Sequence, residues 1–230
     1  MPSPLVQLEA VSRIYPQGSQ QVRAVDRVDL TVACGEFSAL CGPSGSGKTT
    51  ILNLIGGLDL PSEGRVILEG RDLAACPPGE LARLRRDRIG FVFQAYNLIP
   101  VLTAFENAEF VLALQGMPAL ERRQRVMEVL DEVGMAELAN RRPDELSGGQ
   151  QQRVAIARAV APQPAIVLAD EPTANVDSHA AEAILDLMAR LNKERGVTFL
   201  FATHDPRVMA RASRLIHLRD GRLEQEEAKN

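Results

Sequence analysis

The sequence has no long apolar run. No stretch approaches the ~20 consecutive apolar residues with which a helix spans a bilayer. Its first residues, Met1 to Leu5, lack the charged and apolar regions of a secretory signal peptide. Both absences favour a chain that works in the cytoplasm, so work on a membrane would require a partner that spans it.

Runs of basic residues are absent as well. The 230 residues include 26 Lys and Arg against 30 Asp and Glu, which gives a net charge of −4. A nucleic-acid surface normally shows a basic stripe, and attachment to anionic lipid needs a polybasic segment. The charge pattern therefore predicts no nucleic-acid partner and no direct lipid attachment.

Cysteine is scarce. The three residues, Cys34, Cys41 and Cys76, form neither a pair nor a metal-ligand spacing. We therefore expect them to be buried as small apolar side chains. Because Cys41 adjoins the glycine-rich segment 42–50, a bulky thiol reagent on Cys41 is expected to block whatever that segment binds.

The remaining composition, 45% hydrophobic and 24% charged, is ordinary for a globular protein, and the length suits one large α/β domain. Segments 5–11 and 28–32 alternate apolar and polar residues, as half-buried antiparallel strands do. A loop is expected at 15–18, a further strand at 64–68, and buried strands at 37–41, 89–93, 165–169 and 197–202.

Helical patterns separate the buried strands. Helices are expected at 50–55, at 126–133 before Gly134, from the capping residue Ser147 to Pro162, and at 180–191. Such alternation predicts a mostly parallel, covered sheet. We expect one domain over 1–230, with a core at about 1–93 and 162–223, a helical part at about 94–161, a hairpin at Asp220-Gly221 and a frayed tail at 224–230.

The segment 42–49 fits G-x-x-x-x-G-K-[ST], the phosphate-binding loop. Its glycines let consecutive N–H groups turn toward phosphate oxygens. Lys48 brings a positive charge to the β- and γ-phosphates, and the Thr49 hydroxyl is placed to ligate Mg²⁺. The helix that follows would present its N-terminus to the anion. The expected nucleotide-binding residues are Gly42, Pro43, Ser44, Gly45, Ser46, Gly47, Lys48, Thr49 and Thr50.

A phosphate-binding loop alone would also fit kinases, GTPases and motor proteins. The apolar run 166–169 narrows the choice, because it would deliver Asp170 to the carboxyl edge of the sheet, where it can hold Mg²⁺ through water. Glu171, one residue further, is placed to polarise the water that attacks the γ-phosphate. These two acids predict hydrolysis of ATP with Mg²⁺ as cofactor.

The segment Leu146–Gln150 reads Leu-Ser-Gly-Gly-Gln and forms a second anion cradle at a helix N-terminus. With this segment, the chain resembles the ATP-binding subunits of ABC transporters from about Leu5 to Leu223, and Leu146–Gln150 looks like that family's signature motif. The resemblance implies a P-loop NTPase core with a mostly parallel sheet, an N-terminal antiparallel β subdomain and a helical signature subdomain.

The resemblance also implies roles for four further positions. Gln94 matches the family's glutamine that contacts Mg²⁺ and the attacking water, and His204 matches the histidine that contacts the γ-phosphate. Tyr15 lies where the family has an aromatic residue that stacks on adenine, and Asp177 matches an aspartate at the dimer interface. The implied catalytic residues are Glu171, His204 and Gln94, and the implied metal site is Thr49, Gln94 and, through water, Asp170.

The resemblance implies two partners. In a head-to-tail dimer, ATP on the loop 42–50 of one copy would be covered by Ser147, Gly148, Gly149, Gln150 and Asp177 of the second copy. The helical part would carry a surface for an integral-membrane permease. The chain would then lie on the cytoplasmic face of the inner membrane through that permease.

Segments 54–59, 90–103 and 142–158 look closest to the branch that serves lipoprotein release and macrolide export. One departure, Ala174-Asn175-Val176-Asp177 in place of the branch's usual Gly-Asn-Leu-Asp, bears on signalling between subunits. Two alternatives stay open. One is the ATPase of a cell-division complex that transmits force without transport, and the other is a soluble ABC-type protein of DNA repair or translation.

Overall fold

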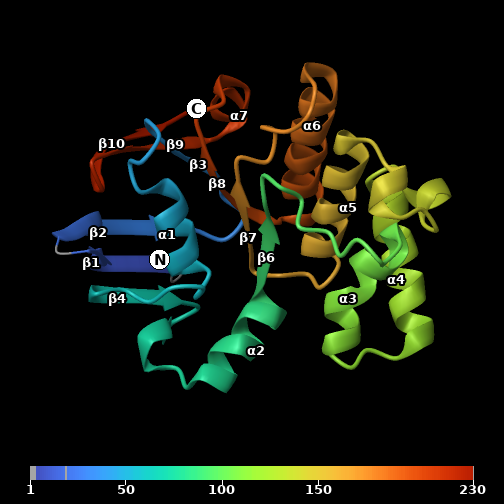
Figure 1. Cartoon of the computed structure of the whole chain (residues 1–230), viewed down its shortest axis with the longest axis horizontal. Coiled ribbons are helices and arrows are strands. Elements are labelled where there is room, and N and C mark those ends of the chain that lie inside the picture. Colours follow the sequence, from blue (N-terminus) through green and yellow to red (C-terminus); the bar gives the residue numbers. More distant parts are fainter. Residues whose placement is uncertain (1–3, 19, 230) are drawn as a thin grey trace.

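The strands form two sheets in the computed structural model, which describes residues 4–18 and 20–229. A four-stranded sheet, in the order β2-β1-β4-β5, lies at one side of the molecule (Figure 1), and a six-stranded sheet, in the order β10-β9-β3-β8-β7-β6, runs through its centre. The strands are β1 Val6–Gln17, β2 Gln20–Val32, β3 Phe37–Cys41, β4 Glu63–Leu68, β5 Arg71–Asp72, β6 Ile89–Val92, β7 Ile166–Asp170, β8 Thr198–Thr203, β9 Arg214–Arg219 and β10 Arg222–Ala228.

The helices cover both faces of the central sheet. They are α1 Lys48–Ile55, α2 Pro78–Arg88, α3 Ala104–Leu114, α4 Ala119–Glu132, α5 Gly148–Val160, α6 Ser178–Arg195 and α7 Pro206–Arg211, with single 3₁₀ turns η1 Leu73–Ala75, η2 Ala136–Leu138 and η3 Pro143–Glu145. In Figure 1, α1 lies on the side of the four-stranded sheet, and α5 and α6 lie on the other side, next to α3 and α4. This arrangement is the α/β fold that the sequence predicted.

The central sheet is parallel from β6 to β9, because β3 pairs with β8 and β9, and β7 pairs with β6 and β8, all in parallel. Every residue of β3 and of β8 is buried. Alternate residues of a strand point to opposite faces, so Leu40 packs with the α1 side while Ala39 packs with the α5 and α6 side. Apolar residues of α3, α4 and α5 belong to the same hydrophobic cluster as Ala39. The division of the chain into a core and a helical part stays a prediction.

Two expectations about chain segments were wrong. The predicted loop at 15–18 is mostly strand, because β1 runs to Gln17 and pairs with β2 to the end of the hairpin. The predicted frayed tail is also strand, since β10 continues to Ala228 with backbone pairing to β9. In both places the pairing strand lies next to the segment in sequence, so an antiparallel hairpin extends past the apolar residues that the sequence pattern detects.

The cysteines differ from expectation in one respect. Cys41 is buried in β3, but Cys34 is exposed in the turn before that strand, and Cys76 is partly exposed. The three thiols are unpaired, as predicted. None of the helices in the described part of the chain is both long and apolar enough to cross a membrane.

Candidate nucleotide site

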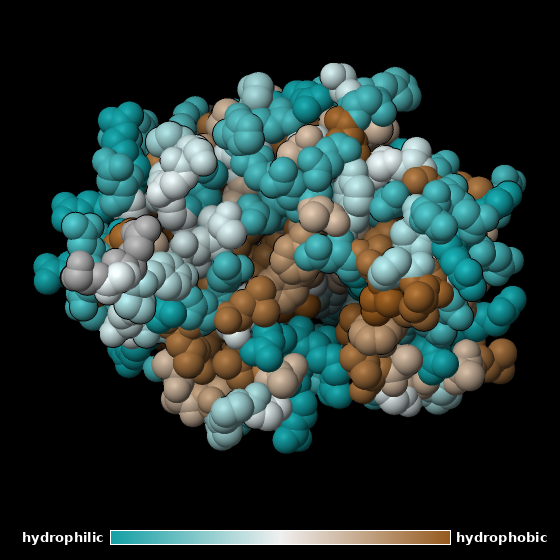
Figure 2. All heavy atoms as spheres, viewed as in Figure 1, coloured by the Kyte–Doolittle hydropathy of each residue, from teal (hydrophilic) through white to brown (hydrophobic). Residues whose placement is uncertain are grey.

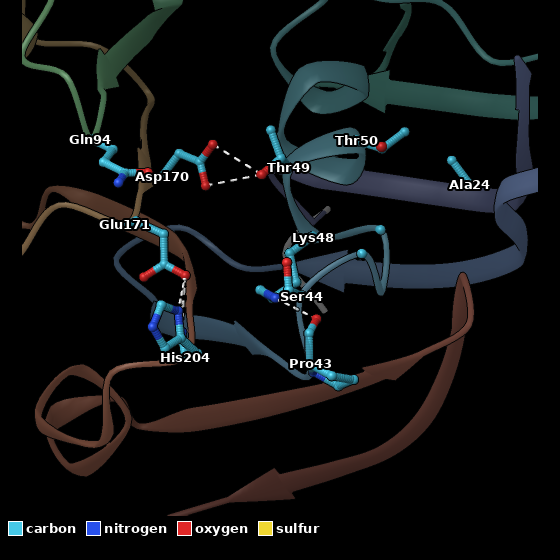
Figure 3. A pocket seen from close by; sticks show the side chains of 12 residues that line it. Ala24, Pro43, Ser44, Lys48, Thr49, Thr50, Gln94, Asp170, Glu171 and His204 are labelled. Atoms are coloured by element: carbon cyan, nitrogen blue, oxygen red, sulfur yellow. Dashed lines mark hydrogen bonds and ion pairs between the residues drawn. The ribbon is translucent and has the colours of Figure 1, made fainter. Parts of the chain in front are cut away.

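A cavity of about 740 Å³ opens at the carboxyl ends of β3, β7 and β8. It is the position at which parallel α/β sheets bind ligands, and its size lies within the usual range for ligand pockets. Figure 3 shows the side chains that line it. The lining residues are Ala24, Pro43, Ser44, Gly45, Gly47, Lys48, Thr49, Thr50, Gln94, Asp170, Glu171 and His204.

The loop after β3 passes so close to other backbone segments that only glycine fits at two positions. Gly42 has φ 148°, and a Cβ there would lie 2.1 Å from the carbonyl oxygen of Leu218. Gly47 has φ 102° and caps α1, and a Cβ there would lie 2.5 Å from the carbonyl oxygen of Ala24. The loop therefore keeps its backbone N–H groups free of side chains next to the N-terminus of α1, as an anion site requires.

Lys48 lies in the first turn of α1 and is 8% exposed. Its Nζ donates to the carbonyl oxygens of Gly42 and Pro43, each at 2.9 Å. An ammonium has three donors, so a third N–H remains for a phosphate oxygen. The loop thus fixes the position of the charge that the sequence predicted for the phosphates.

Thr49 and Asp170 meet across the pocket. The Thr49 hydroxyl donates to the two carboxylate oxygens of Asp170, at 3.1 and 3.0 Å. Burial, more than any other cause, raises the pKa of Asp170, and the neighbouring carboxylate of Glu171 raises it further. Because a nearby cation would favour the charged carboxylate, this pair of oxygen groups suits a hard divalent cation.

Glu171 is held in an unusual backbone conformation, with φ 44°. Its N–H donates to the carbonyl oxygen of Ala202 at 2.9 Å, and Thr203 Oγ1 donates to Glu171 Oε2 at 3.0 Å. Nδ1 of His204 lies 2.5 Å from Glu171 Oε1 (Figure 3). A non-glycine residue with positive φ at a pocket is the kind of strain that functional sites retain.

The signature segment lies elsewhere. Ser147 caps α5: its Oγ accepts from Gln150 N–H at 3.4 Å, and Gln150 Oε1 accepts from Ser147 N–H at 2.9 Å. Asp177 caps α6 by accepting from Ala180 N–H at 2.9 Å. Ser147, Gly148, Gly149, Gln150 and Asp177 are not among the residues that line the cavity. The structure therefore does not bring the loop 42–50 and the segment Leu146–Gln150 of one chain to the same cavity. This agrees with the expectation that the second segment would serve the nucleotide of another copy.

Tyr15 is not among the lining residues of the cavity either. Its hydroxyl donates to Asp59 Oδ2 at 2.7 Å, and the Arg13 guanidinium lies 4.7 Å from the centre of its ring. Arg13 also pairs with Asp59 at 2.7 Å. Tyr15 therefore has a fixed ring orientation, and its role toward adenine stays a prediction.

Asp205 joins two loops beside the cavity, a role that was not predicted from the sequence. It accepts from Thr173 Oγ1 at 2.7 Å, which ties the loop after β7 to the loop after β8. The Arg207 side chain, hydrogen-bonded to it, lowers the pKa of Asp205 to about 2. Asp205-Pro206 is an N-cap followed by a first-turn proline, so the pattern could have indicated the short helix α7. Ala24, which lines the pocket from β2, has no distinguishing sequence signal.

An apolar groove separates the α2–β6 segment from α3. Figure 2 shows hydrophobic surface on both sides of this hollow. The groove has a volume of about 400 Å³ and includes the polar residues Arg85, Arg86, Asn97 and Arg158 beside its apolar residues. The apolar lining residues include Leu58, Phe91, Ile99, Phe110 and Leu114.

Residues 25–174 match the family model described as ABC transporter. The chain belongs to the ABC transporter family. As the P-loop and the two acids after β7 predicted, it is an ATP-binding cassette that hydrolyses ATP.

Known relatives cover nearly the whole cassette. It is 48% identical to the lipoprotein-releasing system ATP-binding protein LolD of Anaeromyxobacter dehalogenans, over 96% of this chain and 93% of LolD. It is 45% identical to the macrolide export ATP-binding/permease protein MacB 1/2 of Paracoccus denitrificans, again over 96% of this chain. The match spans only 33% of that longer protein.

A solved structure resembles this chain to a similar degree in sequence and also in fold. The ATP-binding cassette MJ0796 of Methanocaldococcus jannaschii superposes with a TM-score of 0.91 at 46% identity, covering 98% of this chain and 99% of that one. MJ0796 was solved as a dimer in a post-hydrolysis state bound to ADP and Pi.

Proposed function

We propose that this cassette powers a membrane permease that exports or extracts a lipoprotein, a drug or a peptide-like substrate. The observation that carries the proposal is its 45–48% identity, over 96% of the chain, to the ATP-binding parts of a lipoprotein-releasing system and a macrolide exporter. The apolar groove beside α3 supports it, because exposed apolar hollows of this kind receive partner segments. Through the permease, the cassette lies peripherally on the cytoplasmic face of the inner membrane.

ATP is proposed to bind between two copies. One copy supplies the loop 42–50, and the other supplies Ser147–Gln150 and Asp177, which are not among the residues that line the cavity of their own chain. The dimeric relative bound to ADP and Pi supports this arrangement. Each copy alone has half of the contacts for the triphosphate, so the γ-phosphate favours the closed dimer and hydrolysis opens it.

Mg²⁺ is the proposed metal. Thr49 and, through water, Asp170 would hold it, with the Gln94 side chain in the same cavity. Within residues 4–18 and 20–229, no group of three or more His, Cys, Asp or Glu could hold a metal ion. This suits Mg²⁺, which commonly takes one or two protein ligands and completes its shell with water and nucleotide phosphates. Bound there, it would neutralise charge that develops on the phosphates.

Glu171 is the proposed base in hydrolysis, and His204 is the proposed contact for the γ-phosphate. Thr203 and His204 hold both oxygens of Glu171, so the carboxylate has a fixed direction before water arrives. The loop carbonyls of Gly42 and Pro43 hold the Lys48 ammonium in the cavity, where it would meet the phosphates. Hydrolysis then depends on the arrival of the second copy, whose α5 N-terminus would close the other side of the nucleotide.

Purification of the complex from native membranes tests the proposal. The Glu171→Gln variant is used to hold the ATP-bound assembly together, and the co-purifying membrane protein is identified and reconstituted with the wild-type cassette. A permease with four spanning segments and a large periplasmic domain, which stimulates the ATPase, is the expected partner. A division-type permease together with a peptidoglycan hydrolase would replace transport with force transmission. Binding to DNA or ribosomes at physiological salt would contradict both.

The dimer is tested separately by enzyme kinetics. The specific ATPase activity of the isolated cassette should fall on dilution, because the active species contains two copies. Full activity in a strictly monomeric preparation would contradict the shared site.

A further inference from the structure

A pair of hydrogen bonds joins the loop after β6 to the loop after β7. Tyr96 Oη donates to the carbonyl oxygen of Asn175 at 2.6 Å, and Asn175 Nδ2 donates to the carbonyl oxygen of Gln94 at 3.0 Å. We call this pair the Tyr96–Asn175 bridge. It connects segments about 80 residues apart in the sequence, one bearing Gln94 and the other lying between Glu171 and Asp177.

The bridge holds Asn175, whose neighbours in the second loop have contacts of their own: Ala174 N–H donates to the Glu171 carbonyl oxygen at 3.1 Å, and Val176 packs against the core. Gln152 Nε2 donates to the carbonyl oxygen of Pro172 at 2.7 Å, and Thr173 is tied to Asp205. Asp177 is anchored at the other end, as the cap of α6. In the described part of the chain, the Asn175 side chain donates to the Gln94 carbonyl oxygen, and the Asn175 backbone carbonyl accepts from Tyr96 Oη.

The Tyr96 backbone is itself under constraint. Tyr96 and Asn97 have φ 58° and 50°, two consecutive non-glycine residues in the left-handed region, which costs free energy unless the surroundings hold it. Arg158 on α5 supplies that support: Nη2 donates to the Tyr96 carbonyl at 2.9 Å, and Nη1 donates to the Asn97 carbonyl at 2.5 Å. Arg158 forms no ion pair with a described residue, so the guanidinium serves these two carbonyls.

The bridge lies between the groove and the signature segment Leu146–Gln150. Asn97 and Arg158 both line the apolar groove. At the other end of α5, a Cβ added to Gly148 would lie 2.7 Å from Tyr96 Oη and 3.1 Å from the Asn175 carbonyl oxygen. Tyr96 therefore connects Asn97 and Arg158 in the groove with the N-terminus of α5 and with Asn175.

We propose that Tyr96 is a positioning residue for the reaction: its hydroxyl holds Asn175, and with it the loop 174–176, while Arg158 holds Tyr96. Occupation of the groove then changes the orientation of the loop that carries Asp177 toward the second copy. This last step rests on the proposed permease partner, whereas the bridge itself does not. The substitution Tyr96→Phe would keep the ring packing and remove only the bond to Asn175.

Hydrogen exchange of the isolated cassette, without nucleotide, tests the bridge. In Tyr96→Phe, we expect the amides of 174–176, of which the Ala174 N–H is bonded to the Glu171 carbonyl oxygen, to exchange about five-fold faster than in the wild type, because the loop loses one hydrogen bond that holds it. The exchange of the remaining peptides should be unchanged, and the melting temperature should fall by no more than about 2–4 °C. Arg158→Lys, which keeps the charge but loses the two-pronged geometry, should show the same local increase.

Arg153→Lys is the matched control. Arg153 lies on the same helix, and its Nη1 donates to the Val133 carbonyl at 2.8 Å within the helical part, away from the bridge. It should leave the exchange of 174–176 at the wild-type rate. Catalysis gives the second readout: Tyr96→Phe should lower kcat while the affinity of the cassette for ADP, measured by calorimetry, stays within about two-fold.

Three results would overturn the proposal. They are unchanged exchange of 174–176 in Tyr96→Phe, an equal rise in exchange over the whole chain, and an Arg158→Lys variant that behaves like Arg153→Lys. Failure to find a permease would contradict the proposed function but would leave these local exchange rates as they are. The two failures are therefore distinguishable.

Discussion

Glu171 and His204 face each other at the end of the nucleotide cavity, with 2.5 Å between Glu171 Oε1 and His204 Nδ1. They come from the ends of two neighbouring parallel strands, β7 and β8, whose register pairs Asp170 with Ala202. Thr203 holds the second oxygen of Glu171. The carboxylate is thus held at both oxygens before substrate binds, which is the preorganisation that a general base requires.

We expect Glu171→Gln to bind ATP and to dimerise, but to hydrolyse ATP about 10²–10⁴-fold more slowly, because an amide cannot accept the proton of the attacking water. Steady-state phosphate release and size-exclusion chromatography with light scattering measure the two effects. Glu121→Gln, in the exposed first turn of α4, is the control and should keep wild-type activity. Turnover at the wild-type rate in Glu171→Gln would remove Glu171 from this role.

Lys48→Ala should weaken ATP binding by about 100-fold or more, because the phosphates lose a charge-assisted hydrogen bond inside a cavity. Calorimetric titration with ATP measures the affinity. Lys193, in the last turn of α6, is exposed and away from the cavity, so Lys193→Ala should bind ATP as the wild type does. Equal affinities in the two variants would contradict the assignment of the loop.

The lowered pKa of Asp205 leads us to expect that the stability of the fold depends on pH. Its pKa is about 2 in the fold against an ordinary value of 3.8, so the folded state favours the ionised form. The stabilisation is complete above pH 3.8 and is lost as the pH falls through 2. After allowance for solvent screening, the effect is about 1–2 kcal/mol.

Asp205→Asn should therefore lower the free energy of unfolding by about that amount at pH 7. The difference from the wild type should shrink between about pH 4 and pH 2. Urea unfolding followed by circular dichroism at several pH values measures it. Asp131→Asn, an exposed position on α4, is the control. A difference that is the same at pH 2 as at pH 7 would show that the ionised carboxylate is not the cause.

The thiols should react in the order of their exposure. Cys34 is exposed in the turn before β3, whereas Cys41 is buried and burial raises the pKa of its thiol. A maleimide should therefore label Cys34 first and leave ATP binding intact, because Cys34 lies at the opposite end of β3 from the phosphate-binding loop.

Mass spectrometry of labelled peptides and a Cys34→Ser variant check this order. Labelling of Cys41 in native protein as fast as Cys34 would contradict its burial. Modification of Cys41 that leaves ATP binding intact would reject the hypothesis that a reagent there blocks the nucleotide.

The central part of the fold could be predicted because its signals are local. Buried strands such as β3 and β7 read as almost continuous apolar runs, and Ser147, a favoured N-cap residue, indicates the start of α5. The hairpin ends could not be predicted, since the last residues of β1 and of β10 lack the apolar alternation of a half-buried strand and are strands only through pairing with their neighbours. The exposure of Cys34 likewise depends on where a turn falls relative to the sheet.

By itself, the sequence predicted which groups would meet the phosphates, because the glycines, Lys48, Thr49 and the acids after β7 are set by short spacings within one loop or one strand end. Only the tertiary structure decided which distant segments hold those groups in place. Thr203 and His204 fix Glu171, Asp205 ties Thr173, and Tyr96 bridges to Asn175. Such contacts join positions about 30 to 80 residues apart, and a hydrogen bond over that distance depends on strand order and register, which no local pattern encodes.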